Sequence, residues 1–373
     1  MAKKMLFLFV LLLSLTGMLK AQVTTAGMSG KVMADEESVI GATVVAVHEP
    51  SGTSYGTVTN VDGRFSLQGM RSGGPYKVTV SYIGYQTAIY TDIQLQLGET
   101  YSLNVTLHEA SELLGEITIT ASKSKFSAEK TGATTNISSE QLTTLPSINR
   151  SISDFTRISP YASGNSFGGR DGRSNTFTVD GANLNNNFGL SSGLPGGGNP
   201  ISLDAIDEVQ VVIAPYDVRQ ANFIGAGINA ITKSGTNAYR GSAYMYFNNE
   251  VMRGNKIGDT DFGVRAEESK TVYGATFGGP IIKDKLFFFA NVEYEKSPQQ
   301  VITWRAAKEG ETPNNSTISR TTEADLAEFS QILKDKYGYN TGSFTDFPAD
   351  ITNLKLLGRI DWNINQEIGR AHV

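Results

Sequence analysis

The sequence predicts a mostly β protein with a small sandwich, a glycine-rich segment and several strands of a membrane barrel. Short runs of alternating apolar and polar residues recur along the chain with turn residues between them, which is typical of strands. Glycine is abundant, at 39 of 373 residues. Charged residues make up 18%, below the usual ~25%. This composition favours β-structure over a soluble helical enzyme.

The first 21 residues have the pattern of a secretory signal peptide. Lys3 and Lys4 precede an apolar run, and the small residue Ala21 follows it. The run is shorter than the ~20 apolar residues that a membrane-spanning helix needs, so a membrane anchor is the weaker alternative. We expect export from the cytoplasm, with cleavage after Ala21.

The composition gives little support to catalysis, metal binding or nucleic-acid binding. There is no cysteine and only three histidines, which leaves few metal ligands. The net charge is −5, and no basic tract offers a surface for nucleic acid. Residues 164–168 spell Gly-x-Ser-x-Gly, but that hydrolase motif needs a strand, a helix and a later histidine, and only His372 follows. We therefore predict no catalytic residue, no metal site and no cofactor.

Residues 22–108 are predicted to form a β-sandwich of about seven strands. Residues 41–47 are a β-branched run, and residues 76–83 alternate apolar with polar. Asp62-Gly63 is the sequence of a type I′ hairpin turn. Four short stretches resemble the carboxypeptidase regulatory-like domain, namely residues 30–32, 40–44, 59–65 and 82–85. The resemblance implies a transthyretin-like sandwich with a carbohydrate-binding-like fold, which is a non-catalytic appendage and more often a spacer than a sugar-binding module.

A short alternating strand, residues 116–120, lies within residues 109–132 between polar segments. A strand with no partner is a template for strand addition. The residues alone leave open a second interpretation, a further strand of the preceding sandwich. The segment resembles the TonB box of TonB-dependent outer-membrane transporters, with the rest of residues 109–132 as linker. The resemblance implies that the periplasmic domain of TonB pairs with the main chain of Glu116, Ile117, Thr118, Ile119 and Thr120.

Residues 133–236 are dense in glycine and asparagine and contain one clear strand, residues 206–213. The segment resembles the plug domain of the same transporters, most closely at residues 170–171, 178–181, 206–211 and 226–235. The resemblance implies an α+β domain that fills a barrel lumen and whose outward loops touch substrate. The substrate-binding residues implied are Arg170, Asp171, Arg173, Asn183, Asn185, Asn186, Asn187 and Phe188, with ordinary turns as the alternative.

Residues 237–366 contain four segments of about ten residues that alternate as barrel strands do, at 239–248, 271–279, 285–295 and 353–364. In the last, one face carries Leu354, Leu356, Ile360, Trp362 and Ile364, and the other carries Lys355, Arg359, Asp361 and Asn363. A short link joins the second and third segments, and the other links are long and polar, as in outer-membrane barrels. The second long link holds a predicted helix, residues 323–337, capped by Thr322. A soluble sandwich is the alternative.

The number of residues after the glycine-rich segment predicts that the chain is a fragment. A plugged barrel of 22 strands needs about 220 residues in strands alone, more than follow residue 235. Four strands cannot close, and an open edge is not tolerated in lipid. Residues 367–373 continue no predicted strand and look like translated sequencing-adapter read-through.

The resemblances together imply TonB-dependent transport across a Gram-negative outer membrane, in a receptor of the Bacteroidetes type. The expected partners are the TonB periplasmic domain, outer-membrane lipid and a surface lipoprotein. The substrate stays open among iron chelates, vitamins, glycans and peptides. An adhesion or carbohydrate-binding protein that uses the sandwich is an alternative, as is a signal transducer that engages a periplasmic regulator.

Overall fold

The computed structural model describes residues 23–34, 37–109, 117–120, 133–147, 150–185, 199–215, 217, 220–261, 268–300, 304–314, 318–344, 348–364 and 371–372. The predicted signal peptide lies outside these residues. Contacts divide the chain into two compact units. The first comprises residues 1–241, 276–291 and 356–373, and the second comprises residues 242–275 and 292–355.

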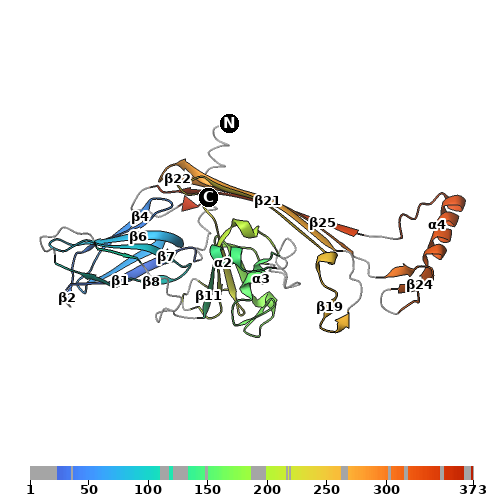
Figure 1. Ribbon diagram of the computed structural model, residues 1–373, viewed down its shortest axis with the longest axis horizontal. Coiled ribbons are helices and arrows are strands. Elements are labelled where there is room, and N and C mark those ends of the chain that lie inside the picture. Colours follow the sequence, from blue (N-terminus) through green and yellow to red (C-terminus); the bar gives the residue numbers. More distant parts are fainter. Residues whose placement is uncertain are drawn as a thin grey trace, which may run out of the picture. The chain divides into compact units, whose positions relative to one another are not determined.

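The sandwich (residues 27–108) has two sheets, drawn in blue in Figure 1. One has the order β2-β1-β5, with β8 and β9 also paired to β1, and the other has the order β10-β7-β6-β3-β4. Alternate residues of the inner strands point into the core, so Val44, Ala46, Val78 and Val80 are completely buried. The strands are β1 (Ala26–Ala34), β2 (Glu37–Ser38), β3 (Thr43–His48), β4 (Thr53–Val58), β5 (Arg64–Met70), β6 (Gly73–Ser81), β7 (Ala88–Leu95), β8 (Thr100–Ser102), β9 (Val105–Leu107) and β10 (Ile117–Thr120).

The hairpin predicted at Asp62-Gly63 is wrong. Strand β4 pairs with β3 in one sheet and β5 pairs with β1 in the other, so the turn carries the chain between sheets. Gly63 has a φ of 72°, but Asp62 is not among the residues with positive φ, as a type I′ turn would require. The Asn60 side chain closes the turn instead, because its Oδ1 accepts hydrogen bonds from the Asp62 and Arg64 main-chain N–H groups.

The plug segment (residues 133–236) is built on one five-stranded sheet, in the order β11-β16-β17-β14-β15. Strands β16 and β17 are almost entirely buried. Residues 164–168 lie at the two-residue pair of β12 and β13, without the strand and helix of a nucleophile motif. The elements are β11 (Thr134–Ser138), α2 (Ser139–Thr144), α3 (Ile152–Thr156), β12 (Ala162–Ser163), β13 (Ser166–Phe167), η2 (Gly172–Ser174), β14 (Thr176–Val179), β15 (Ala182–Asn183), η3 (Leu203–Ala205), β16 (Ile206–Val212) and β17 (Gly227–Thr232).

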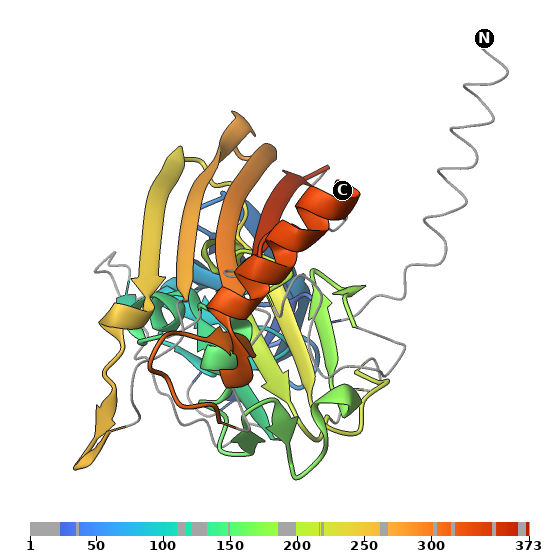
Figure 2. The ribbon, with the colours of Figure 1, turned by 90° about the vertical axis from the view of Figure 1, so that its right-hand side faces the viewer.

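Four long strands follow in a separate sheet, in the order β18-β21-β22-β25, and we call them the wall strands (Figure 2). They are β18 (Arg240–Asn249), β21 (Ser269–Ile282), β22 (Leu286–Gln300) and β25 (Pro348–Trp362), close to the four predicted segments. The predicted helix is α4 (Glu323–Tyr337), which has Thr322 as N-cap and Gly338 in the left-handed conformation after its end. The shorter elements are η4 (Glu250–Met252), β19 (Lys256–Ile257), β20 (Thr260–Asp261), β23 (Arg305–Ala307), β24 (Ile318–Thr322) and β26 (Ala371–His372).

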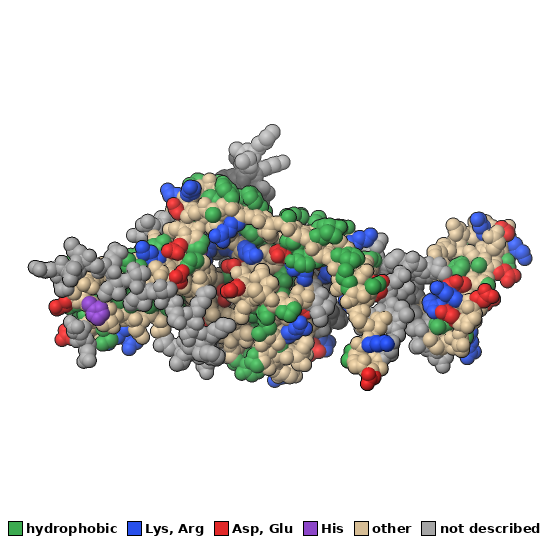
Figure 3. Space-filling view, viewed as in Figure 1, with side chains coloured by type: hydrophobic (Ala, Val, Ile, Leu, Met, Phe, Trp, Pro, Cys, Tyr) green, Lys and Arg blue, Asp and Glu red, His purple; other side chains and the backbone are tan. Residues whose placement is uncertain are grey.

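Two of the wall strands, β22 and β25, bury polar side chains and expose apolar ones over part of their length. In β22, Asn291, Glu293 and Glu295 are at most 7% exposed, whereas Val292 and Tyr294 are more than 40% exposed. The same inversion holds on β25, and hydrophobic side chains gather along the surface over these strands in Figure 3. A soluble sheet would bury its apolar side chains and expose its polar ones. The burial observed here therefore fits strands with one face in lipid.

Two further observations concern the predicted membrane region. None of the helices among the described residues is long and apolar enough to cross a membrane. Residues 371 and 372, predicted to continue no strand, form β26, which pairs with Asp361 and Trp362 of β25.

Candidate functional site

The predicted TonB-binding strand is the edge strand of the sandwich. Within it, Ile117 to Thr120 form β10, which runs parallel to β7. The register places Ile117 opposite Ala88 and Thr120 opposite Thr91. Glu116, the first residue of the predicted segment, lies outside the described residues. The expectation of a strand without a partner is therefore wrong, because a continuous sheet accepts any extended segment that reaches its edge.

The turn after β7 anchors the sandwich to the plug segment through the main chain of Leu97. The Leu97 N–H donates to both carboxylate oxygens of Glu208, at 3.0 and 3.1 Å. The Leu97 carbonyl accepts hydrogen bonds from Gln210 Nε2 at 2.5 Å and from Asn136 Nδ2 at 3.3 Å. Leu97 is completely buried. Two neighbouring plug strands thus hold the main-chain N–H and C=O of a single residue of the sandwich.

This contact continues across the plug sheet as a line of buried polar side chains. Asn229 Nδ2 on β17 donates to Gln210 Oε1 on β16, and Thr178 Oγ1 on β14 donates to Asn229 Oδ1 at 2.8 Å. These residues are register partners on adjacent strands. Thr178, Asn229 and Gln210 each find a partner on the next strand, which avoids the cost of leaving these groups unsatisfied in the core.

Glu208, which takes part in this contact, and its neighbour Asp207 are both acidic. Burial raises the pKa of Glu208 to about 8, against the hydrogen bond from Leu97, which lowers it, and the charges of Asp207 and Glu99 raise it further. A hydrogen bond from Ser72 acts in the lowering direction. Burial also raises the pKa of Asp207, although the positive charges around it oppose this. With a pKa of about 8, the Glu208 carboxyl group is mostly protonated at neutral pH.

We expect the stability of the folded state to fall as pH rises from about 5 to 8, and Glu208→Gln to remove part of that slope. In this window the unfolded chain has already released the Glu208 proton while the folded chain still holds it, so rising pH favours unfolding. The contribution is on the order of several kcal/mol across the window. Thermal unfolding at pH 5, 6, 7 and 8 measures it. Equal slopes for the two proteins would contradict the assignment.

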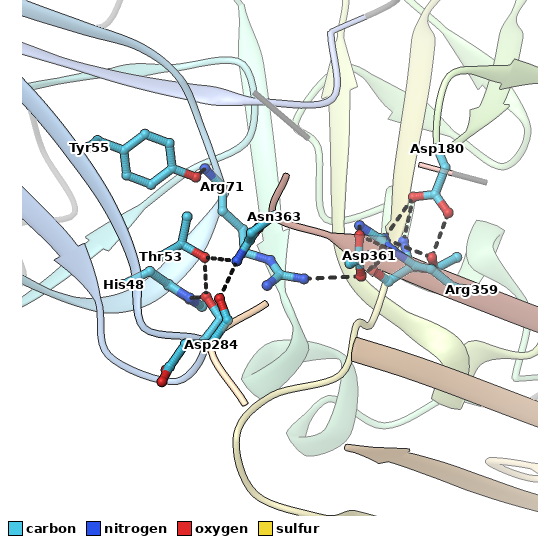
Figure 4. Close-up of polar contacts among 11 residues, drawn as sticks. His48, Thr53, Tyr55, Arg71, Asp180, Asp284, Arg359, Asp361 and Asn363 are labelled. Carbon is cyan, nitrogen blue, oxygen red and sulfur yellow. Dashed lines mark hydrogen bonds and ion pairs between the residues drawn. The ribbon is translucent and has the colours of Figure 1, made fainter. Parts of the chain in front are cut away.

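A cluster of charged side chains joins the plug segment, the sandwich and strand β25 (Figure 4). Arg359 donates from Nη1 to the Thr232 carbonyl at 2.7 Å and lies 3.4 Å from Asp180 Oδ1. Its Nε and Nη2 atoms contact the Asp361 carboxylate at 3.0–3.1 Å. Arg71 of the sandwich reaches the same carboxylate at 3.4 Å. Asp361 is 1% exposed, so its buried charge needs compensating partners, and these two arginines are among them.

Asp180 is held in place by its backbone and by Thr232. Its φ of 47° lies in the left-handed region, which aspartate tolerates better than most residues. Its carboxylate accepts hydrogen bonds from the Thr232 N–H at 2.9 Å and from Thr232 Oγ1 at 2.5 Å. A polar cavity of about 30 Å³ adjoins the cluster, with Ser72 and Asp207 also in its lining. That volume suits a water molecule rather than a substrate.

Nearby, Asn363 makes a smaller polar contact between the wall and the sandwich. Its Nδ2 donates to Thr53 Oγ1 at 3.0 Å and to the Asp284 carbonyl at 3.1 Å (Figure 4). The Asp284 carboxylate in turn accepts a hydrogen bond from Asn237 Nδ2 at 2.7 Å. The sandwich is thus held by side chains as well as by the Leu97 peptide.

The substrate-binding residues predicted on the plug segment fall into two turns. Asp171 caps η2 and accepts hydrogen bonds from the Arg173 main chain and side chain, at 2.9 and 2.8 Å. The Arg173 hydrogen bond lowers the pKa of Asp171. Asn183 accepts from the Asn185 N–H at 2.8 Å. Arg170 is exposed. Asn186, Asn187 and Phe188 lie outside the described residues.

These two turns meet at Asn175, a residue that the sequence interpretation missed. Asn175 Oδ1 accepts the Ala226 N–H at 2.9 Å, and its Nδ2 donates to the Asn165 carbonyl at 2.8 Å. The Asn175 carbonyl accepts from Asn185 Nδ2 at 3.3 Å. A Cβ on Gly225 would lie 2.2 Å from Asn175 Oδ1, which explains the glycine there. No local pattern marks an asparagine that links three distant loops.

Comparison with known proteins identifies two domains. Residues 27–108 match the carboxypeptidase regulatory-like domain, and residues 231–366 match an outer membrane beta barrel domain. The TonB-dependent transporter Oar of Myxococcus xanthus is 24% identical over 330 residues, which cover 83% of this chain and 29% of Oar. The chain thus spans less than a third of that relative's length.

Solved structures of outer-membrane receptors are also similar to this chain. The siderophore receptor PirA from Acinetobacter baumannii has 20% identity and a TM-score of 0.38, and the match covers 62% of this chain and 29% of PirA. The ferric enterobactin receptor PfeA from Pseudomonas aeruginosa has 14% identity and a TM-score of 0.41, covering 64% and 32%.

The two domain matches and the likeness to Oar agree with the features described above. Both matched domains have the β-structure expected of them, and the wall strands carry the inverted burial of a lipid-facing sheet. The predicted resemblance and the predicted outer-membrane location are confirmed. The chain thus combines a carboxypeptidase regulatory-like domain with an outer membrane beta barrel domain, and these matches, together with the likeness to Oar, support a TonB-dependent receptor.

Proposed function

We propose that the protein imports a substrate across the outer membrane with energy delivered by TonB. The likeness to a TonB-dependent transporter over 83% of the chain carries this proposal, because it spans far more than either matched domain alone. In this function the plug segment closes the lumen, and TonB pulls on residues 116–120 to displace it. The work is mechanical, so no residue is assigned to bond chemistry.

The ion cluster around Arg359 supports a plug that is seated against the wall. Its partners come from the plug segment, through Asp180 and Thr232, and from strand β25, through Asp361. Paired charges keep a fixed geometry while the plug is seated, and they become hydrated again when the plug moves away from the wall. A contact of this kind suits a stopper that must open and reseat better than a continuous apolar core would.

The substrate-contacting surface is proposed to be the turns that carry Arg170, Asp171, Arg173, Asn183 and Asn185, together with residues 186–188. The hydrogen bonds of Asp171 and Asn185 shape these turns, and Arg170 offers an exposed cation. The substrate class stays open among iron chelates, vitamins, glycans and peptides. A surface lipoprotein that caps the barrel is a further proposed partner.

Dependence on TonB tests the proposed function. Cells expressing the protein from its natural gene are compared with a gene deletion and with a strain lacking TonB, using radiolabelled ferric chelates, cobalamin, labelled oligosaccharides and labelled peptides. We expect one probe to accumulate in wild-type cells alone, with at least a tenfold loss in both mutants. Sugar binding that depends on the sandwich and persists without TonB would instead indicate the adhesion alternative.

A further inference from the structure

Strand β10, which forms most of the predicted TonB-binding segment, pairs with β7 of the sandwich. Strand β10 is the last strand of its sheet, in the order β10-β7-β6-β3-β4. Among the described residues, one edge of β10 is paired with β7 and the other is the open edge of the sheet. This inference rests on the proposed function, because it concerns how the same segment meets TonB.

A strand paired on one side can still accept a partner on the other. In a parallel pair, successive residues direct their N–H and C=O groups to opposite sides of the strand. Two of the four residues of β10 therefore face β7, and the other two face the open edge. TonB that pairs by strand addition needs only this open edge. It does not have to displace β7.

Pairing with β7 also removes a cost of binding. A free segment of four residues loses backbone conformational entropy when it becomes a strand. On β7 the segment is already extended, so a partner at the open edge meets an ordered template. Prior ordering of the segment on β7 would raise its affinity for TonB, whereas concealment of the segment by β7 would lower that affinity.

The strand that holds β10 is itself anchored. Strand β7 ends at Leu95, and two residues later Leu97 is held by Glu208, Gln210 and Asn136 of the plug segment. The template is therefore a fixed part of the folded chain rather than a tethered module. A partner that arrives at β10 meets a strand paired with β7, and the turn after β7 is bound to the plug segment.

We propose that the sandwich presents the TonB-binding segment, by holding β10 extended on β7 and leaving its outer edge for TonB. The sheet of the sandwich then continues into TonB through β10. In this arrangement the carboxypeptidase regulatory-like domain is a docking platform for the energy-coupling partner, beyond the role of a spacer.

A reversible crosslink between β7 and β10 tests the proposal. The chain has no cysteine, so Thr91→Cys with Thr120→Cys introduces a single pair of thiols at positions that are opposite in the register. Neighbouring strands lie about 4.8 Å apart, within the Cα separation of about 4.4–6.8 Å that disulfides span. The protein is expressed from its natural gene and extracted from outer membranes, and mass spectrometry verifies the bond. Immobilised periplasmic domain of TonB from the same organism is the binding probe.

We expect the oxidised double variant to bind the TonB domain as tightly as the reduced one, or up to about tenfold more tightly. Thr120→Cys alone, oxidised and reduced, controls for the change within the segment itself. A loss of tenfold or more on oxidation, reversed by dithiothreitol, would show that β7 conceals the segment and would overturn the proposal. Failure of the two thiols to crosslink would overturn it as well.

The outcomes separate this proposal from the proposed function. If wild-type protein does not bind the TonB domain at all, the proposed function fails, whatever the crosslink does. If wild-type protein binds and the crosslinked protein does not, TonB coupling stands and presentation by the sandwich is wrong.

Discussion

Uptake is expected to fall to the level of a strain lacking TonB when Ile117 is replaced by proline. Proline removes one main-chain N–H and fixes φ near −65°, so it interrupts a strand that is recognised through its backbone. The four residues of β10 offer few hydrogen bonds, and each one lost is a large share of the contact. Accumulation of the probe identified in the transport assay measures the effect.

The controls for Ile117→Pro separate the backbone from the side chain. Ile117→Ala keeps the N–H and the extended conformation, so we expect it to retain most uptake. Thr118→Pro removes the N–H of the next residue instead. In a strand that N–H faces the edge of β10 opposite to the edge faced by the Ile117 N–H. Amounts of protein in the outer membrane should be equal for all variants. Normal uptake by Ile117→Pro would remove residues 117–120 from the TonB-binding site.

Replacement of Arg359 by methionine is expected to destabilise the protein by about 3–5 kcal/mol, because it removes a guanidinium that contacts the buried Asp361 carboxylate. It also removes the hydrogen bonds to Thr232 and the ion pair with Asp180, which connect strand β25 with the plug segment. The unfolding midpoint in detergent measures the loss. A plug that is less firmly seated should also let large antibiotics enter the cell.

A matched arginine in an exposed pair provides the control for Arg359→Met. Arg173 pairs with Asp171 at 2.8 Å, but both side chains are more than half exposed. Water already solvates such pairs, so Arg173→Met should leave the unfolding midpoint unchanged within error. Asp361→Asn combined with Arg359→Met should cost less than the two single changes added together. Equal effects of the two arginine variants would contradict a buried anchor at Arg359.

The elements that the sequence predicted correctly are those with a local signature. Period-two alternation marked the wall strands, and the structure buries the polar side of β22 and exposes the apolar side, as expected for strands that face lipid. Thr322 and Gly338 marked both ends of α4 by the chemistry of helix caps. In each case a few neighbouring residues contain the whole signal.

The predictions that failed concern partners far away along the chain. Asp62-Gly63 has the sequence of a hairpin turn, but whether the strands on either side pair depends on which sheet accepts each of them. Asn175 gave no signal, because its role is to satisfy main-chain groups of Asn165 and Ala226 in other loops. No pattern in the sequence marked Leu97, yet its main-chain N–H and C=O bind the sandwich to the plug segment.

The sequence by itself determined the β-rich class, the order of the segments and the two faces of the wall strands, because alternation and turn chemistry act over a few residues. Only the tertiary structure decided which edge holds residues 117–120 and which charges meet at Arg359. Both depend on backbone edges and buried groups that must find partners, and those partners lie tens to hundreds of residues away.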